Sequence, residues 1–403
     1  MPRQYDVIII GGGIAGSVLG NSLAEQGKQV LILEREKAFR DRVRGEYIHP
    51  WGVAEIRALG IYDMLRGTCG YEARYRINQV LDALPVARRD VIETTPHKVG
   101  SLHFYHPDMQ EALLTAAGHS GADIRRGALV VEVNPGSSPS VVVREGELQH
   151  TYHSRLVIGA DGRTSLCRNW AGFETRHDPG RLVIMGLLMT GLKAAEDTVY
   201  YFINPARHEY CVIIPLGNSR FRSYTGFHQQ EGRRRLSGQK DIREFIAIAE
   251  SAGAPGEWFE NAEASGPLAS FDCADTWVEH PYTNGIVLIG DAASSSDPTF
   301  GSGLSLAMRD VRVMRDLLLN EIDWDLAGHQ YADEHDTYFG AIHRLTDWMT
   351  KLMYEPGAVA AARREKAFAR IINDPRRLPD LVGLGPEFPS DEAAYKNLFG
   401  EAG

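Results

Sequence analysis

A glycine-rich segment near the start of the chain has the residue types and spacing of a dinucleotide site. Gly11, Gly13 and Gly16 form the pattern G-x-G-x-x-G directly after the apolar run 5–10. Glycines there allow a tight turn, close approach of the backbone to a pyrophosphate and close packing of the next helix, whose N-terminus attracts phosphates. Glu34 follows about 20 residues later, where a carboxylate accepts hydrogen bonds from ribose hydroxyls. The segment predicts a site for a flavin or nicotinamide dinucleotide.

Two aspartates stand in turns that follow short apolar runs. Asp161 lies in Gly-Ala-Asp-Gly after residues 156–158, and Asp291 lies in Gly-Asp-Ala-Ala after residues 286–289. Each carboxylate could contact a ligand. Alternatively, it could only cap a helix or form an Asx turn, because Asp is favoured at helix N-caps. For Asp161 the capped helix would be 164–170. Both interpretations stay open for each residue.

A second glycine-rich turn follows Asp291. Pro298, Gly301 and Gly303 precede a segment with helical periodicity, which we expect to run from residue 304 to 320. The start of such a helix directs backbone amides and a positive dipole end toward a ligand. If the ligand is a flavin, this favours the negative charge that reduction leaves on the ring.

A polar stripe is expected on one strand in the middle of the chain. Arg220, Arg222, Tyr224 and His228 would share one face of that strand, because side chains alternate between faces. The face could lie in water, or it could place Arg222 and Tyr224 toward a flavin and a substrate. Tyr201, Tyr224 and His228 are candidates for a general base, and no spacing distinguishes among them.

The elements that must position these residues are readable from periodicity. Residues 5–10, 14–26 and 29–33 predict a strand, a helix and a strand, which is a βαβ unit. Helices are also expected at 53–65 (with a turn at 59–61), 107–117, 241–252, 330–353 and 359–372. Strands are expected at 129–133, 141–143, 156–158 and 286–289, together with alternating segments over 71–105 and 181–227. The latter spacing indicates an antiparallel sheet inserted as a second lobe.

Composition excludes several other classes. The 403 residues are enough for two or three lobes, and 43% hydrophobic with 24% charged residues is close to the globular average. A net charge of -10 argues against a nucleic-acid partner. Four dispersed cysteines predict neither a zinc site nor a redox disulfide, and they fit a reducing cytoplasm. Without an apolar run of about 18 residues, no stable membrane association is expected.

Three motifs, in this order along the chain, resemble those of the flavin monooxygenases of the p-hydroxybenzoate hydroxylase family. They are the glycine-rich pattern at 11–16, the Gly-Ala-Asp-Gly turn, and the Gly-Asp-Ala-Ala turn with the proline and glycines that follow it. The resemblance spans the chain to about residue 320. It implies an α/β (α+β) fold, in which a Rossmann-like FAD-binding domain is interleaved with an antiparallel β-sheet substrate domain and followed by C-terminal helices. We expect the FAD-binding domain at 1–70, 101–175 and 276–330, the substrate domain at 71–100 and 176–275, and a helical segment at 331–403.

The resemblance also implies roles for individual residues. Noncovalent FAD would be held by the three glycines of the first motif and by Glu34, Arg35, Arg44, His106, Asp161, Asp291, Gly301 and Gly303. His106 stands where relatives have Arg or Gln, and Arg42 competes with Arg44 for the FAD diphosphate or ribityl chain. A surface salt bridge is the alternative for either arginine. Arg222, Tyr224 and Pro298 would form the catalytic side.

The resemblance implies a monooxygenase that uses NADH or NADPH as a transient reductant. FAD would then react with O2 to give a C4a-hydroperoxyflavin, which hydroxylates or epoxidises an electron-rich, aromatic or polycyclic small molecule. A flavin-linked reductase or dehydrogenase and a halogenase remain alternatives on the same scaffold, although the Trp-x-Trp-x-Ile-Pro segment of halogenases is absent. A non-enzymatic flavoprotein is a further alternative. The substrate and the oligomeric state stay undetermined.

Overall fold

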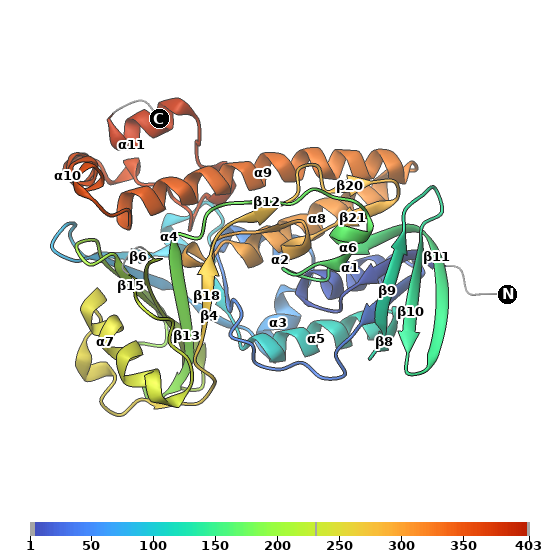
Figure 1. The fold of residues 1–403 in the computed structure, drawn as a ribbon, viewed down its shortest axis with the longest axis horizontal. Coiled ribbons are helices and arrows are strands. Elements are labelled where there is room, and N and C mark those ends of the chain that lie inside the picture. The colour runs from blue at the N-terminus through green and yellow to red at the C-terminus, as the bar shows by residue number, and fades with distance from the viewer. Residues whose placement is uncertain (1–4, 230–231, 401–403) are drawn as a thin grey trace.

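Two large β-sheets stand side by side in the computed structural model, which describes residues 5–229 and 232–400. The outer ends of the expected ranges 1–70 and 331–403, and two residues within 176–275, lie outside the described residues. Figure 1 shows a mainly parallel sheet with its helices on the right and an antiparallel sheet on the left. The long helix α9 (Trp324–Met353) passes over both.

The first sheet has a parallel core, with strand order β20-β21-β11-β1-β2-β8. The neighbours from β21 to β8 run parallel, while β20 is antiparallel to β21. A hairpin of β9 and β10 extends from β11. The strands are β1 (Tyr5–Ile10), β2 (Val30–Glu34), β8 (Asp123–Arg126), β9 (Leu129–Asn134), β10 (Ser140–Glu145), β11 (Leu148–Gly159), β20 (Tyr282–Thr283) and β21 (Ile286–Leu288).

Both faces of the parallel sheet are covered, which explains why its strands are nearly continuous apolar runs. Val7 and Ile9 point toward one core, and Ile8 and Ile10 point toward another. The first core lies under three helices, and the second lies under the β9–β10 hairpin. The helices are α1 (Ile14–Glu25), α5 (His106–His119) and α8 (Gly303–Asn320).

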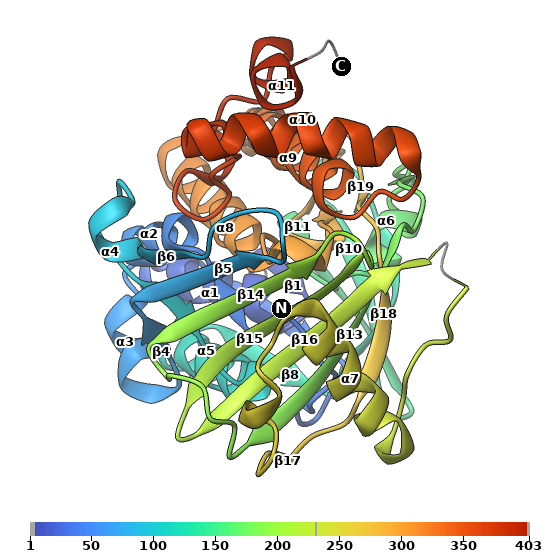
Figure 2. The same cartoon turned by 90° about the vertical axis from the view of Figure 1, so that its left-hand side faces the viewer.

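The second sheet has the order β17-β13-β16-β15-β14-β5-β6, with β18 also paired to β13. All its pairs are antiparallel except β14 with β5. The strands are β5 (Tyr75–Val80), β6 (Ala87–Asp90), β13 (Leu182–Thr190), β14 (Thr198–Asn204), β15 (Glu209–Gly217), β16 (Arg220–His228), β17 (Glu263–Ala264) and β18 (Ala269–Cys273). Helix α7 (Ile242–Ala252) packs on its outer face, as Figure 2 shows. The inner face turns toward the parallel sheet.

Shorter elements complete the fold. Two three-stranded sheets have the orders β12-β19-β22 and β3-β7-β4. The remaining strands are β3 (Tyr47–Ile48), β4 (Tyr71–Ala73), β7 (Ser101–His103), β12 (Arg176–His177), β19 (Thr276–Trp277) and β22 (Ser294–Ser295). The remaining α-helices are α2 (Pro50–Ala58), α3 (Tyr62–Thr68), α4 (Val91–Thr94), α6 (Leu166–Trp170), α10 (Ala358–Asn373) and α11 (Glu392–Phe399). No helix of the described part of the chain is long and apolar enough to cross a membrane.

The expected fold class is confirmed, two local expectations are corrected, and one alternative left open by the sequence is decided. Helix α9 begins six residues before the expected position 330, because Asp323 accepts hydrogen bonds from the amides of Asp325 and Leu326 and so caps an earlier start. Strand β11 is longer than 156–158, because its first half pairs with β10. Strand β16 is buried along most of its length, so its polar face does not lie in water.

Candidate active site

Two cavities meet between the sheets. The first, which we name the glycine-side cavity, is lined by Gly11, Gly13, Glu34, Arg35, Asp161 and neighbouring residues of the parallel-sheet unit. The second, the sheet-side cavity, is lined by Tyr201, Tyr224, Pro298, Gly301 and other residues between the inner face of the antiparallel sheet and the start of α8. The residues that line both cavities are Arg44, His106, Arg163, Asp291, Leu304 and Ala307. We call these six residues the boundary.

The three glycines of the first motif have different tasks. A Cβ at Gly11, whose φ is +105°, would stand 2.3 Å from Ala160 O, and one at Gly16 would stand 2.1 Å from Gly11 O. These two glycines therefore permit close backbone packing. A Cβ at Gly13 would meet only Gln110 Nε2, at 4.0 Å, so a side chain there would enter the cavity. No side chain caps α1, whose first amides remain available to a ligand.

Glu34 is buried at the end of β2, and backbone amides already hold its carboxylate. Gly12 N donates to Oε2 at 2.8 Å, and Glu36 N donates to Oε1 at 2.7 Å. Each oxygen keeps a second lone pair. The carboxylate is thus oriented by the turn that follows β2, and it lines the glycine-side cavity.

Asp161 caps a helix and also lines a cavity. Its Oδ2 accepts hydrogen bonds from Leu166 N at 2.8 Å and Cys167 N at 3.1 Å, at the start of α6. Its Oδ1 is buried without a partner among the described residues. The two interpretations of Asp161 from sequence therefore do not compete, because one oxygen caps α6 and the other remains open to a ligand.

Asp291 lies in the turn that begins at Gly290, but its side chain caps no helix of the described structure. No hydrogen bond is formed by its carboxylate among the described residues, and it lies on the boundary between the cavities. Burial raises the pKa of Asp291, while Arg44, Arg163 and Arg168 oppose that rise. The turn itself is held by buried Asp310, whose Oδ2 accepts a 2.7 Å hydrogen bond from Gly290 N.

The turn before α8 also faces the sheet-side cavity. A short 3-10 helix (Pro298–Phe300) is followed by Gly301, whose φ of +71° favours glycine. No side chain caps α8, so the first amides after Ser302 have no side-chain acceptor. The hydroxyls of Ser296 and Ser302 are buried without a partner among the described residues. Unsatisfied donors at a helix start are the groups that an anionic or carbonyl-bearing ligand would satisfy.

The arginines after β2 separate into two groups. Arg42 forms an ion pair with Glu36 at 2.7 Å, which is the surface salt bridge considered as its alternative, and it also lines the glycine-side cavity. Arg44 lies on the boundary and forms no ion pair with a described residue, and its carbonyl oxygen accepts a 2.8 Å hydrogen bond from Tyr224. Arg35 is exposed, lies 3.7 Å from Glu36 and lines the glycine-side cavity.

His106 is the first residue of α5 and lies on the boundary. Its amide donates to Glu46 Oε1 at 3.0 Å, and its Nδ1 lies 2.8 Å from Gly45 O. Because a carbonyl only accepts, Nδ1 carries the proton. Burial lowers the pKa of His106 to about 4, although the bond to Gly45 opposes this. The ring is therefore neutral at pH 7.

The wall opposite the boundary is one face of the antiparallel sheet. Cross-strand register aligns Tyr201 with Val212, Val212 with Tyr224, and Tyr224 with Gly186. Residues directly opposite share a face, so the chain places residues of six strands on one surface. The cavity-lining members are Arg76, Ile184, Val199, Tyr201, Val212, Ile214, Tyr224 and Phe271. The surface is mostly apolar.

Arg222 lies on the same face as Tyr224 but lines neither cavity. Its side chain is fully buried and binds two acids of the opposite unit, Glu46 (Nε to Oε2, 2.7 Å) and Asp41 (Nη2 to Oδ2, 3.0 Å). The expected direction toward flavin and substrate is therefore replaced by a buried ion-pair cluster. Sequence alternation gave the correct face, but two acids 176 and 181 positions away decided the contact.

The three candidate bases have different surroundings. Tyr201 lines the sheet-side cavity, and its hydroxyl donates to Thr299 O at 3.0 Å and lies 3.0 Å from the hydroxyl of Tyr354. Tyr224 lines the same cavity. Burial raises the pKa of both tyrosines. His228 is buried near His208 and does not line either cavity.

Several cavity residues were not singled out from sequence. They include Arg76 and Tyr47 in the sheet-side cavity, Gln110 and Trp170 in the glycine-side cavity, and Arg163 on the boundary. Arg163 directly follows the Gly-Ala-Asp-Gly turn, so its nearness to that motif was a usable signal. Arg76 carries no such signal, because it lies in an alternating segment without a motif.

The two cavities fit FAD. The uncapped start of α1 and the space at Gly13 suit a pyrophosphate, and Glu34 suits a ribose. The boundary residues suit the ribityl chain, and the uncapped start of α8 suits the ring carbonyls. An elongated dinucleotide would thus extend from the glycine-side cavity across the boundary.

Comparisons with known proteins agree with this geometry. The family described as "FAD binding domain" matches residues 4–344. A digeranylgeranylglycerophospholipid reductase of Methanococcoides burtonii is 28% identical over 76% of this chain and 72% of its own. A 3-amino-4-hydroxybenzoate 2-monooxygenase of Streptomyces cremeus is 23% identical over 96% of this chain and 97% of its own. In fold, the flavin-dependent brominase Bmp2 superposes with a TM-score of 0.76 at 18% identity, covering 98% of this chain and 96% of its own.

The match to the family covers both sheets and every residue of the boundary. The expectation from the three sequence motifs is therefore confirmed. The chain belongs to the FAD binding domain family, and it is an FAD-dependent oxidoreductase of the p-hydroxybenzoate hydroxylase type.

Proposed function

We propose that the protein is a monooxygenase that uses NADH or NADPH and O2 to hydroxylate or epoxidise an electron-rich, aromatic or polycyclic small molecule. The observation that carries this proposal is the boundary between the two cavities. A dinucleotide whose phosphates bind at α1 would extend toward Asp291 and the start of α8, both of which line the mostly apolar sheet-side cavity or its boundary. A substrate in that cavity and the cofactor's reactive ring would then share one space.

The protein would hold FAD along one continuous path. We propose that Gly11, Gly13 and Gly16 with Glu34, Arg35 and Asp161 bind its adenosine and phosphate end, and that Arg44, His106, Asp291, Gly301 and Gly303 bind the ribityl chain and ring. When bound, FAD supplies the redox chemistry and the activation of O2. The amides at the start of α8 stabilise negative charge beside them.

The residues of the sheet-side cavity would position the substrate. Tyr224 and Pro298 line this cavity, and Tyr201 presents a hydroxyl that is already part of a buried hydrogen-bond chain. We propose that Tyr201, whose proton is donated to Thr299 O, accepts the hydrogen bond that orients a polar substituent of the substrate. Arg222 would act through Glu46, which holds the amide of His106. It is thus a positioning residue in this proposal.

The nicotinamide donor would bind only transiently. The sequence contains a single G-x-G-x-x-G, and one dinucleotide already accounts for it. We propose that NADH or NADPH reduces FAD and leaves. We also propose that the protein works in the cytoplasm without a nucleic-acid partner or stable membrane association. The domain ranges given above are proposed as the bounds of its lobes. These proposals rest on the sequence and on the single route for a dinucleotide that the two cavities offer.

Hydride transfer without oxygen insertion is the second candidate, and the similarity to the reductase of Methanococcoides burtonii favours it. The similarity to a brominase concerns the fold alone, so it supports the halogenase alternative only in that both reactions could use this scaffold.

The deciding experiment is NAD(P)H oxidation by the FAD-loaded protein in air, screened against electron-rich aromatics. For a monooxygenase, background oxidation is slow, the right substrate accelerates it, and the product gains one oxygen atom that carries label from 18O2. Product that forms without O2, or that gains hydrogen and no label, overturns the proposal in favour of hydride transfer. A halide-dependent product favours the halogenase.

A further inference from the structure

Three side chains that are common metal ligands meet beneath α9, where β12 runs in Figure 1. Asp178 follows β12, Asp275 precedes β19, and His343 lies on α9 itself. One ligand atom of each lies within 4.8 Å of those of the other two, and we call the three residues the α9 cluster. None of them lines the glycine-side or the sheet-side cavity, so the cluster is separate from the site described above. No sequence pattern indicates it, because Asp178 and His343 are 165 positions apart.

His343 is held in one orientation by aromatic rings. The centre of its ring lies 4.6 Å from that of Trp277 and 5.8 Å from that of Phe339, with which it stacks. Its Nε2 lies 2.8 Å from Asp178 Oδ2. Two ligand atoms that bind one Zn²⁺ ion at about 2.0–2.2 Å are roughly 3 to 3.5 Å apart. The imidazole and the carboxylate are thus close to the spacing of ligands that share an ion, although the same distance also fits a direct hydrogen bond.

Asp275 is the member of the cluster that points to a bound ion. The residue is only 4% exposed. Its Oδ1 accepts a 3.0 Å hydrogen bond from Asp297 N, while its Oδ2 has no hydrogen-bond or ion-pair partner among the described residues. The carboxylate faces Asp178 and His343, because its ligand oxygen lies within 4.8 Å of their ligand atoms. A buried carboxylate that lacks a cation costs free energy, and a bound metal ion would offset that cost.

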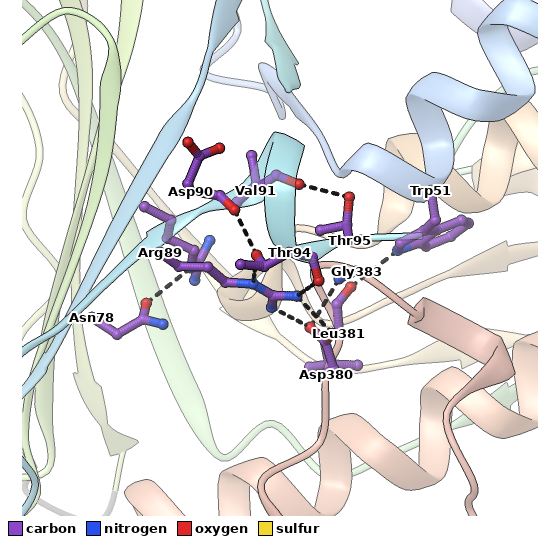
Figure 3. A network of polar contacts seen from close by, with 11 residues as sticks. Trp51, Asn78, Arg89, Asp90, Val91, Thr94, Thr95, Asp380, Leu381 and Gly383 are labelled. Carbon is purple, nitrogen blue, oxygen red and sulfur yellow. Dashed lines mark hydrogen bonds and ion pairs between the residues drawn. The ribbon is translucent and has the colours of Figure 1, made fainter. Parts of the chain in front are cut away.

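Arginine neutralises a partly buried acid elsewhere in the protein. The two oxygens of Asp380 lie 2.6 and 2.9 Å from the Nη atoms of Arg89 (Figure 3). Asp275 has no such partner. Arg181 is the arginine whose charge acts on the α9 cluster, but its guanidinium binds Asp347 at 2.9 Å. Among the described residues, no lysine or arginine forms an ion pair with Asp275.

The α9 cluster therefore has too little positive charge. His343 carries at most one positive charge, and it faces the carboxylates of Asp178 and Asp275. The charge of buried Asp297 also acts on Asp275. A divalent cation would supply the missing charge. One imidazole nitrogen with two carboxylates favours Zn²⁺, because Ca²⁺ and Mg²⁺ prefer oxygen ligands, and a water molecule would complete a tetrahedral set.

We infer that Asp178, Asp275 and His343 form a binding site for a divalent metal ion of the zinc type. His343 would release the proton of Nε2 and bind through this atom, so that bonds to the ion replace its hydrogen bond with Asp178. The ion would tie α9 to β12 and β19. Asp275 also holds the amide of Asp297, which precedes Pro298 in the wall of the sheet-side cavity, so the ion would brace that wall. This inference depends neither on the substrate nor on the reaction proposed above.

The test is isothermal titration of the FAD-loaded protein with ZnCl2 after treatment with a chelator. The proteins are the wild type, Asp275→Asn, His343→Gln and the control His329→Gln. His329 also lies on α9 but is exposed, and its Nδ1 lies 2.8 Å from His280 Nε2. That surface pair is the place where zinc would bind adventitiously. Asp275→Asn keeps an acceptor for the amide of Asp297, so the fold is expected to survive this change.

The wild type should bind one equivalent of zinc. Asp275→Asn and His343→Gln should each weaken that binding more than about 100-fold, because loss of even an outer partner of a metal ligand typically costs 10- to 100-fold. Zinc should raise the melting temperature of the wild type and of His329→Gln, but not that of the other two variants. The inference is overturned if the wild type binds no zinc, if Asp275→Asn or His343→Gln binds it as the wild type does, or if His329→Gln removes the binding.

X-ray absorption at the zinc edge gives a result that does not depend on the folding of any variant. The wild type with one equivalent of zinc should show scattering from one imidazole and otherwise oxygen ligands. Two imidazoles would place the ion at the surface pair of His280 and His329, and none would exclude His343, so either result overturns the inference. Neither measurement uses a reductant or a substrate, so failure of the monooxygenase proposal leaves their outcome unchanged.

Discussion

Arg222 and Glu46 form a buried ion pair that joins the antiparallel sheet to the chain segment before α2. The two residues are 176 positions apart, and Arg222 Nε donates to Glu46 Oε2 at 2.7 Å. Glu46 Oε1 accepts from both Arg222 Nη2 and the amide of His106 at 3.0 Å. Burial raises the pKa of Glu46, and the hydrogen bond and charge of Arg222 oppose that rise. The pair therefore links the substrate sheet to a residue of the boundary.

Replacing Arg222 by Ala should affect stability and turnover more than FAD content. The change leaves Glu46 buried without its partner, which typically costs about 3–5 kcal/mol of the free energy of unfolding. Urea unfolding of Arg222→Ala, of the double variant with Glu46→Gln and of the control Arg220→Ala measures this. The double variant should recover part of the loss. Turnover per bound flavin should fall, and an unchanged ratio would exclude a positioning role.

Replacing Gly13 by Val should remove FAD while the protein still folds. The new side chain meets little protein and enters the glycine-side cavity, where it would exclude the pyrophosphate. Flavin absorbance per protein and a thermal melt measure the two effects. Gly67→Ala is the control, because Gly67 has open space around it and lies on α3, away from both cavities. Normal FAD content in Gly13→Val would mean that the glycine serves only packing.

Replacing Asp291 by Ala should weaken FAD binding, or turnover with FAD retained, without loss of stability. Its carboxylate caps no helix among the described residues, and its burial costs free energy. The contrast is Asp297→Ala: Asp297 Oδ1 accepts from Thr299 N at 2.8 Å, and loss of such a cap costs about 1 kcal/mol. Equal destabilisation of both variants in urea, with wild-type FAD affinity for Asp291→Ala, would contradict this prediction.

Stability should rise with pH between about pH 5 and 7 partly because of His103. Burial lowers its pKa to about 3 from the unfolded value of 6.5, so only the unfolded chain takes up this proton as the pH falls below 6.5. The stabilisation is therefore complete above that value and is progressively lost toward acid. His103→Gln should reduce the change between pH 7 and 5 by about 2 kcal/mol. His119→Gln, an exposed histidine on α5, is the control in urea unfolding at both pH values.

Much of the cofactor site could be predicted from sequence because it is local. Gly11, Gly13 and Gly16 stand in one turn between β1 and α1, where the chain must bend tightly whatever packs against it, and Glu34 ends the strand beside them. Asp291 was placed correctly in a turn, although the sequence left its capping alternative open. The structure resolves that alternative, because the carboxylate of Asp291 accepts no hydrogen bond from a backbone amide of the described residues.

The rest of the site depends on contacts between distant segments. Alternation assigned Arg222 and Tyr224 to one face of β16, but it could not show that Glu46 and Asp41 bind Arg222 while Tyr224 remains at the cavity. The observed start of α9 differs from the expected position 330 for a simpler reason. Asp323 is a favourable N-cap, and hydrophobic periodicity alone does not detect it.

By itself, the sequence determined the dinucleotide motif, the order of strands and helices and the family, since these follow from backbone conformation and periodicity over short stretches. Only the tertiary structure decided which charges are neutralised. Arg89 meets Asp380 from the far end of the chain, while Arg76, directly opposite Arg89, meets no acid among the described residues. The physical reason is that charge pairing depends on sheet register and on packing between remote segments, and neither is encoded within any single stretch of sequence.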